Sequence, residues 1–479
     1  MYQVDALGLL DGNSTDEEHV RDVAFDASGA MYLVGATSSS DFPVTAGALD
    51  TTYGTGGASL GTAGPMDGFV VKIDPQGQIV WATYLGGPNF ERAYAVEVDD
   101  AGAIYVAGRA GEGFPTTSGA LQENFLDDTG PNTRYGKQDG FIAKLAPDGK
   151  SLIWATYFGG TGLGFVRDID VDAQGRVHIA AHIAGTSPYI TSDADRANRL
   201  GVNDALYAVL SADGASISYA TYMGGTSTGG GFSSNPSVRV TSDGGAYFVY
   251  YDNADDVPVS TTAYQKTRNG GFDIVLSRIT PQRAIDWTTY LGGSQNEDLE
   301  THSLTIDADG RPVVGGRTFS NDFPVTANTV QTVTGSTTEA DGFISILSAT
   351  GDQLIASTYF GGTQRDEVEG LAVLSDGKII VSGSTRSNFL PVDAASFQAS
   401  PGGGKDGFMA SFSSDLTSTF YATYFGGTGD DALRTIEVGP NDEAAIGGDT
   451  TSSSFPTVNS ADIVVNGQFG AVYGRLTLQ

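Results

Sequence analysis

Hydrophobic and polar residues alternate in short stretches along the whole chain, and this period of two predicts β-strands. Seven of these stretches align with one another, and each begins a repeating unit. Their paired apolar positions are Val23/Phe25, Val96/Val98, Ile169/Val171, Val238/Val240, Leu304/Ile306, Leu371/Val373 and Ile436/Val438. The sequence shows no long stretch with the 3.6-residue period of an α-helix, which disfavours a helical repeat.

Each alternating stretch is followed by the same series of short elements. In the second unit a tight turn at 99–102 leads to a second strand at 104–108, and a longer loop then carries Phe114 and Pro115. A third strand follows at 139–145, and a fourth ends in Thr-Tyr-Phe-Gly-Gly at 156–160. Four antiparallel strands per unit are typical of a β-propeller blade.

The closing phrase Thr-Tyr-x-Gly-Gly occurs six times, at intervals of 65 to 73 residues. Its last glycines are Gly87, Gly160, Gly225, Gly293, Gly362 and Gly427. Copies in register at this spacing indicate repeated supersecondary units. Because glycine adopts positive φ without a steric penalty, we predict that these glycines have left-handed backbone geometry.

Seven first strands are present, but only six closing phrases follow them. The last unit ends at 471–476, which has the pattern of a third strand, and residues 1–12 resemble a degenerate fourth strand. We therefore predict an all-β fold, a single seven-bladed β-propeller with four antiparallel strands per blade. The N-terminal strand, at 4–10, should complete the last blade beside 471–476 and so remove an open sheet edge.

The whole chain, 1–479, is expected to form this one propeller domain. The approximate repeat limits are 13–87, 88–160, 161–225, 226–293, 294–362, 363–427, and 428–479 plus 1–12.

Three motifs resemble the SBBP repeat, a β-propeller repeat found mostly in large extracellular proteins of bacteria. They are Thr-Tyr-[Leu/Phe]-Gly-Gly, Asp-Phe-Pro-x-Thr at 41–45, and Asp-Gly-Phe-x-x-Lys at 67–72. The third and fourth units depart most, with Pro188-Tyr189 and Asp256-Val257-Pro258 in place of Asp-Phe-Pro. The resemblance implies a propeller and extracellular or cell-surface display. It implies no particular reaction, because the family is defined by its fold.

The amino-acid composition limits the classes of molecule that the chain is expected to bind. The chain has 25 Lys and Arg against 57 Asp and Glu, a formal net charge of −32, which repels nucleic acid phosphates. Cations, basic proteins and neutral glycans remain. The absence of Cys excludes thiol catalysis and Cys-ligated zinc. We expect no transmembrane segment, because no apolar run is long enough. We also expect a bacterial extracellular or cell-surface protein whose leader is absent from this chain.

The strand order places all the long loops on one face of the propeller, here called the loop face. The opposite face, the turn face, carries only tight turns. Binding residues lie preferentially on long loops held by a rigid scaffold, so we expect the loop face to bind the ligand. One of its longest loops, 121–138, contains the candidate residues Asp127, Asp128 and Tyr135.

Acidic residues recur after the closing phrase. Glu91, Asp366 and Asp431 each lie four residues beyond its last glycine, and Glu18 takes the equivalent place in the first unit. On a closed ring we expect them to surround the mouth of the central channel, where they would attract a cation or a basic ligand. No cofactor is required by the sequence, and calcium is the candidate ion because only oxygen ligands are present there. The alternative is that they are ordinary solvated charges.

Candidate catalytic groups are few. His178 and His182 lie about 13 Å apart if they are on one strand, which is too far to share a metal. We favour a non-enzymatic binding or scaffold module with a protein or glycan partner. The alternative is a carbohydrate-active enzyme, a polysaccharide lyase or hydrolase that uses carboxylates at the channel mouth. An enzyme should carry a residue cluster specific to one blade, whereas a binding module should present a broad loop surface.

Overall fold

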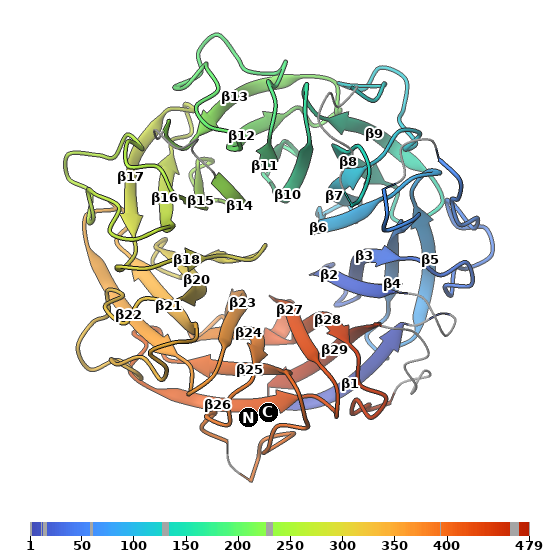
Figure 1. Ribbon diagram of the computed structural model, residues 1–479. Helices are drawn as coiled ribbons and strands as arrows, with labels where there is room; N and C mark the ends of the chain where they lie inside the picture. The colour runs from blue at the N-terminus through green and yellow to red at the C-terminus, as the bar shows by residue number, and fades with distance from the viewer. Residues whose placement is uncertain are drawn as a thin grey trace.

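The computed structural model describes residues 2–10, 12, 17–57, 61–126, 134–226, 233–392, 394–459 and 469–478. These residues form seven separate β-sheets that surround a central channel, as Figure 1 shows from the loop face. The predicted all-β propeller is confirmed. Within the described ranges the one helical element is a 3₁₀ turn at Pro440–Asp442, and no helix is long and apolar enough to cross a membrane.

Six blades are formed by consecutive strands, and within each blade the strands pair antiparallel from the channel outwards. Blades one to three comprise β2 (Glu18–Phe25), β3 (Met31–Thr37), β4 (Asp67–Ile73) and β5 (Ile79–Leu85), then β6 (Arg92–Val98), β7 (Ile104–Ala110), β8 (Asp139–Leu145) and β9 (Leu152–Phe158), then β10 (Gly164–Val171), β11 (Val177–Ile183), β12 (Asp204–Leu210) and β13 (Ile217–Met223). Blades four to six comprise β14 (Ser233–Val240), β15 (Ala246–Asp252), β16 (Asp273–Ile279) and β17 (Ile285–Leu291), then β18 (Glu297–Asp298), β19 (Leu304–Ile306), β20 (Pro312–Thr318), β21 (Asp341–Leu347) and β22 (Leu354–Phe360), then β23 (Asp366–Val373), β24 (Ile379–Thr385), β25 (Asp406–Phe412) and β26 (Thr419–Phe425).

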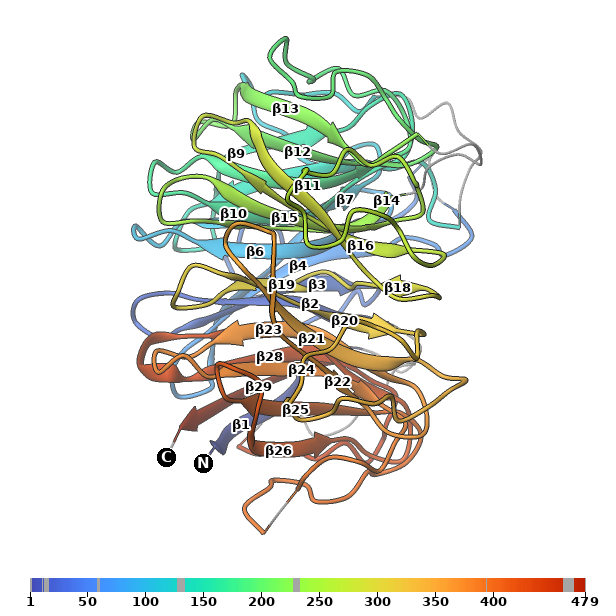
Figure 2. The same cartoon turned by 90° about the vertical axis from the view of Figure 1, so that its left-hand side faces the viewer.

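The seventh blade joins the two ends of the chain. Its strands run in the order β27 (Asp431–Val438), β28 (Ala444–Thr450), β29 (Gly470–Leu478) and β1 (Tyr2–Leu10). Strand β1 pairs antiparallel with β29, with Leu7 opposite Gly474 and Leu10 opposite Ala471. The predicted closure by the N-terminal strand is therefore confirmed. Figure 2 shows both termini close together on the turn face.

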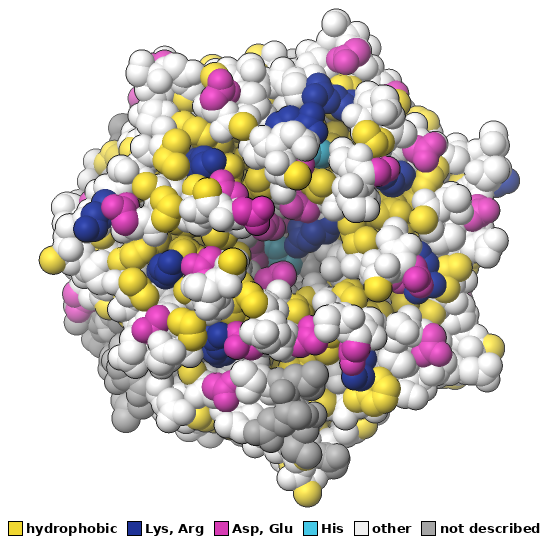
Figure 3. Space-filling view, turned by 180° about the vertical axis from the view of Figure 1, so that it is seen from behind, with side chains coloured by type: hydrophobic (Ala, Val, Ile, Leu, Met, Phe, Trp, Pro, Cys, Tyr) yellow, Lys and Arg dark blue, Asp and Glu magenta, His cyan; other side chains and the backbone are white. Residues whose placement is uncertain are grey.

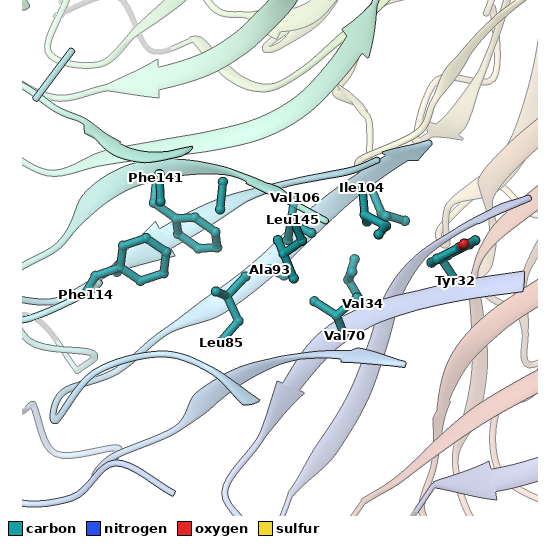
Figure 4. Close-up of a cluster of buried hydrophobic side chains, with 14 of the residues drawn as sticks. Tyr32, Val34, Val70, Leu85, Ala93, Ile104, Val106, Phe114, Phe141 and Leu145 are labelled. Carbon is teal, nitrogen blue, oxygen red and sulfur yellow. The ribbon is translucent and has the colours of Figure 1, made fainter. Parts of the chain in front are cut away.

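The core lies between adjacent blades. Figure 4 shows one of these interfaces, where Val70 and Leu85 of blade one pack near Val106 and Phe141 of blade two. All four side chains are buried, because the alternation of apolar residues turns one face of each sheet towards the next blade. Each blade therefore depends on both of its neighbours to cover its apolar faces.

The glycines of the closing phrase do not have the predicted geometry. All six last glycines are described, and none has a positive φ; among the preceding glycines Gly224 does, at 118°. Their positions are set instead by lack of space. A Cβ on Gly86 would lie 2.8 Å from Asp67 Oδ1 and 2.9 Å from Glu91 Oε2, and one on Gly87 would lie 2.5 Å from the carbonyl oxygen of Gly113. Glycine is needed here because carboxylates and backbone approach closely.

The closure predicts that the N-terminal strand contributes strongly to stability. Leu7 is fully buried, whereas Gln3 on the same strand is exposed. We expect Leu7→Ala to lower the free energy of unfolding by about 2–5 kcal/mol. The matched control Gln3→Ala should change it by about 0.5 kcal/mol or less. Chemical denaturation followed by tryptophan fluorescence measures both, and equal stability of the two variants would contradict a structural role for β1.

Candidate functional site in the central channel

The four carboxylates predicted to ring the channel mouth do not form an open ring. Glu18, Glu91, Asp366 and Asp431 are each 0% exposed. The carboxylate of Glu91 accepts hydrogen bonds from the backbone N–H groups of Gly87 (2.8 Å) and Gly111 (3.1 Å). Asp366 and Asp431 accept equivalent bonds from the last glycines of their own closing phrases, at 2.6 and 2.7 Å. These side chains fix the turns between blades and leave no surface for a ligand.

Burial changes the acidity of these groups. It raises the pKa of Glu91 to about 8, of Asp366 to about 7 and of Asp431 to about 6, and hydrogen bonds to the carboxylates oppose this rise. Among the described residues, no group of three or more His, Cys, Asp and Glu side chains is placed to hold a metal ion. The structure therefore does not assemble the calcium site that the sequence suggested.

The three candidate binding residues of the 121–138 loop differ in what the structure shows of them. Asp127 and Asp128 lie outside the described residues. Tyr135 packs against Phe90, with ring centroids 4.9 Å apart and ring planes tilted by 50°, and its ring lies 4.1 Å from the guanidinium carbon of Arg109. Arg109 is not among the residues that the sequence predicted to bind a ligand, and the contact places Tyr135 beside basic residues of the loop face.

The middle of the channel is lined by residues at β-bulges. Register shifts of one residue interrupt the pairing of the inner strand in blades one, two, three, six and seven, and a wider irregularity between Ser234 and Ser237 interrupts it in blade four. A bulge re-aims the extra side chain, and the residues at these five shifts are Arg21, Tyr94, Arg167, Glu369 and Arg434. Arg21, Tyr94, Glu369 and Arg434 line one small cavity at the channel axis, so residues from four blades converge there.

Basic residues of blades five to seven line a larger opening on the loop face, here called the basic cavity. Its volume is about 380 Å³, and its lining residues are Glu300, Arg317, Arg365, Glu367, Ser384, Arg386, Lys405 and Arg434. Its arginines are paired with carboxylates. Arg317 lies 2.5 Å from Glu367, and Arg434 lies 2.7 Å from both Glu369 and Asp449.

Four further arginines from blades one to three lie across the channel, and we call Arg21, Arg92, Arg109 and Arg167 the arginine cluster. Within the described part of the chain, none of the four has a carboxylate within 4.0 Å, and the buried Nε atom of each has no hydrogen-bond partner. Three of the guanidinium groups, those of Arg92, Arg109 and Arg167, lie against aromatic rings instead. Arg109 lies 4.8 Å from the ring of Phe90 and 4.9 Å from that of Phe165.

The arginine cluster perturbs the groups inside it. Burial and the like charges of Arg92 and Arg434 lower the pKa of Arg21 to about 10. Burial opposes ionisation of Tyr94, but the positive charges of the four arginines outweigh it and lower the pKa of the phenol to about 7. The shift at Tyr94 reports the positive charge gathered around its ring, which a bound anion would relieve, whereas the shift at Arg21 is due first to burial.

Blade five contains a feature found in no other described blade. Its inner strand is divided into β18 and β19, because the chain between Glu297 and Leu304 is two residues longer than between Glu91 and Val96. The intervening residues 299–303, here called the channel loop, project towards the axis in Figure 1. His302, at φ 69°, places its Nε2 atom 3.0 Å from the carbonyl oxygen of Tyr94. The cavity beside it has a volume of about 10 Å³, so the channel loop leaves little space at this point of the channel.

The turn-face end of the channel has the opposite charge. A cavity of about 480 Å³ there is lined by acidic side chains, among them Asp22, Glu97 and Glu437, with Arg239 between them. Figure 3 shows Asp and Glu side chains gathered around this central hollow. Arg239 is neutralised by Asp168 at 2.7 Å. The channel is therefore basic at the loop face and acidic at the turn face.

Comparisons with known proteins do not assign a family or a function to the chain. No protein-family model matches the chain, so the resemblance to the SBBP repeat stays a prediction. The regulatory protein FlaEY of Caulobacter vibrioides is 27% identical over 188 residues, which cover 36% of this chain and 19% of that protein. The match thus spans about a fifth of that relative's length.

Three solved structures are similar in fold. A protein of unknown function from Dyadobacter fermentans has a TM-score of 0.47 at 10% identity and covers 100% of this chain and 99% of its own. The WD40 domain of Neurospora crassa Pan2 has a TM-score of 0.44 at 9% identity, covering 98% and 96%. A polysaccharide lyase described as an ulvan lyase has a TM-score of 0.43 at 10% identity, covering 92% and 93%.

The buried carboxylates predict a pH dependence of stability. The pKa of Glu91 is about 8 in the folded protein, above its ordinary value of 4.5. Its stabilising contribution is therefore fully present below about pH 4.5 and is lost as the pH rises through about 8. We expect Glu91→Gln to reduce the fall in unfolding free energy between pH 5 and pH 8, measured by denaturation at each pH. The exposed control Asp100→Asn should keep the slope of the wild type, and a wild-type slope in Glu91→Gln would contradict this account.

Proposed function

We propose that this chain is a binding module for an acidic oligosaccharide, which it holds at the loop-face mouth of the central channel. The observation that carries the proposal is the arginine cluster, four guanidinium groups with no carboxylate within 4.0 Å among the described residues, in a chain of net charge −32. An arginine presents a planar fork of donors that matches a carboxylate or sulfate group. A ligand with several such groups would supply the missing negative charge.

The positions of the basic residues also favour this ligand over the neutral glycan or basic protein that net charge alone suggested. Nine of the chain's 25 basic residues belong to the arginine cluster and the basic cavity. The loop-face mouth is thus locally positive although the molecule is strongly negative. The surrounding negative charge would repel an extended nucleic acid, whereas a short acidic glycan fits within the positive region.

The surface around the mouth is a poor match for a protein partner. Protein interfaces depend on large apolar anchors at their centre. Among the described residues the exposed large hydrophobic side chains are Ile79, Val80, Ile153, Val202, Val330, Val333, Ile355 and Phe420, and none of them belongs to the arginine cluster or lines the basic cavity. A hydrophilic, charged ligand is consistent with this distribution.

We place this role outside the cell or at the cell surface of a bacterium. The support is the resemblance of the Thr-Tyr-x-Gly-Gly and Asp-Phe-Pro motifs to repeats of bacterial extracellular proteins. Cell fractionation tests this location separately. We expect the native protein in the culture medium or attached to the cell surface.

Calorimetric titration tests the ligand. The probes are oligogalacturonate, a sulfated neutral oligosaccharide, and an uncharged cello-oligosaccharide. We expect the acidic probes to bind and the uncharged one not to bind. Each hydrogen bond to a charged group contributes about 1.5–3 kcal/mol, so the double variant Arg92→Gln/Arg167→Gln should weaken binding by about 100-fold or more.

The matched control is Arg311→Gln, which removes an arginine of the turn face that is paired with Asp307 at 2.6 Å. This variant should bind like the wild type, and thermal unfolding should show that all three proteins are folded. Equal binding of charged and uncharged probes, absence of binding to both acidic probes, or an equal loss in the control would refute the proposed function.

A further inference from the structure

The basic cavity opens on the loop face and narrows at its inner end. Two of its lining residues, Glu300 and Arg434, also line the small cavity at the channel axis. The two cavities therefore meet, but their volumes are very different, about 380 Å³ and about 10 Å³. A space of about 10–15 Å³ holds a single water molecule. A sugar ring can enter the basic cavity but cannot pass from it along the axis.

The channel loop forms part of this inner end and is held firmly in place. Glu300 belongs to this loop, and so does His302, which is 3% exposed. The Nε2 atom of His302 lies 3.0 Å from the carbonyl oxygen of Tyr94. The two nitrogens of the same ring lie 3.5 Å from Asp22 and 3.7 Å from Asp168. Contacts from three other blades thus fix the loop, and the inner end of the basic cavity is closed by ordered structure.

Lys405 differs from the other basic residues of the basic cavity. Each of the four arginines that line it has a carboxylate within 4.0 Å. Among the described residues, the ammonium group of Lys405 has no carboxylate at such a distance and makes no hydrogen bond. The charges of the arginines are therefore neutralised locally, whereas the charge of Lys405 is available to a ligand.

The backbone of Lys405 is held on both sides. Its N–H group donates a hydrogen bond to Oδ1 of Asp430 at 2.9 Å, and its carbonyl oxygen accepts one from the N–H group of Asp431 at 2.6 Å. Asp431 is the first residue of β27, the inner strand of the next blade. These bonds place Lys405 at the junction of blades six and seven, where the inner strand begins on the loop face.

The charge at this place is specific to one blade. Lys405 directly precedes the third strand of blade six, and it is the only basic residue at this place in the repeat. The corresponding residues of the other blades are Met66, Gln138, Asn203, Phe272, Ala340 and Phe469. A residue type that occurs in one of seven repeats is not required by the architecture of the blade. This favours a role for Lys405 in binding.

We propose that the basic cavity is a blind pocket for the end of an acidic oligosaccharide, and that Lys405 binds the acid group of the terminal sugar. This inference rests on the proposed function, because it takes the acidic glycan as the ligand, and it adds which part of that glycan enters. A cavity closed at its inner end admits a chain end, whereas an internal sugar needs room for the chain on both sides. Small-molecule sites have volumes of about 300–1,000 Å³, and the basic cavity lies within this range.

The charges inside the basic cavity orient the terminal sugar. Glu300, at the inner end, has no ion pair among the described residues, and its carboxylate repels an acid group. Lys405 lines the basic cavity but not the small cavity, so it lies away from that end. An ammonium group donates hydrogen bonds, whereas a carboxylate accepts them. The acid group is therefore directed to Lys405, and hydroxyl groups of the terminal ring can donate to Glu300.

Calorimetric titration with octagalacturonate and polygalacturonate tests recognition of the chain end. We expect one bound protein per chain with both probes, because each chain has one end of the recognised kind. A doubly modified octasaccharide has its reducing end converted to an alditol and its non-reducing 4-hydroxyl methylated. It should bind about 10-fold or more weakly, because hydrogen bonds of the terminal sugar to charged groups are lost. If only the sulfated oligosaccharide binds, the same two modifications are made on that probe.

Variants of one residue separate recognition of the chain end from folding. Lys405→Gln should weaken binding of the unmodified octasaccharide by about 10-fold or more, and it should reduce the difference between unmodified and doubly modified chains. Lys405→Arg keeps the positive charge and should bind more tightly than Lys405→Gln. The matched control is Lys378→Gln, which removes a lysine of the same blade that is paired with Asp376 on the turn face and should bind like the wild type. Thermal unfolding shows whether each variant is folded.

The outcomes distinguish this inference from the proposed function. A wild type that binds both octasaccharides equally, or of which several copies bind each long chain, overturns the inference and leaves the binding role intact. Binding by folded Lys405→Gln at the level of the wild type also overturns it. A wild type that binds no acidic glycan refutes the proposed function, and the inference fails with it.

Discussion

Closure of the ring is the constraint on which the rest of the structure depends. A blade buries apolar side chains on both faces of its sheet, and only neighbouring blades can cover them. The seventh blade lacks a fourth strand of its own, so the first strand of the chain supplies it through the pairing of β1 with β29. Once the ring is closed, the inner strands of all blades face one axis, and side chains such as Arg21 and Arg167 meet although they are far apart in sequence.

The arrangement of charge follows from that geometry. Carboxylates such as Glu91 are used inside the turns between blades, where backbone N–H groups hold them and burial raises their pKa. Arginines are used at the axis. Those of blades five to seven are neutralised locally, whereas the arginine cluster is not. A protein with a large negative charge thus keeps a small positive region where the channel opens on the loop face.

The sequence was sufficient to predict the architecture, because every repeat has the same pattern of four strands. The last repeat is one strand short, and this shows that the N-terminal strand must complete it. It was insufficient for the site. Reasoning from period two assigns every second residue of an inner strand to the channel, but a bulge shifts that assignment, and Tyr94 and Arg167 lie at bulges. Repetition also drew attention to Glu91 and its counterparts, whose recurrence reflects architecture, and away from arginines that occur in only some blades.

The extra residues of blade five give a further signal that the sequence contained and that periodicity alone did not interpret. The insertion before Leu304 forms the channel loop, and His302 reaches the backbone of blade two from it. An insertion in one repeat makes the ring asymmetric at that blade. A site for a single ligand at the axis requires such asymmetry.

The position of the two termini has a consequence for how the propeller could be mounted. Both ends of the chain leave from the turn face, on the side opposite the basic opening. A tether, a neighbouring domain or a solid support attached at either end would hold the molecule by its acidic side. The basic opening would then point away from the point of attachment and towards the surrounding solution.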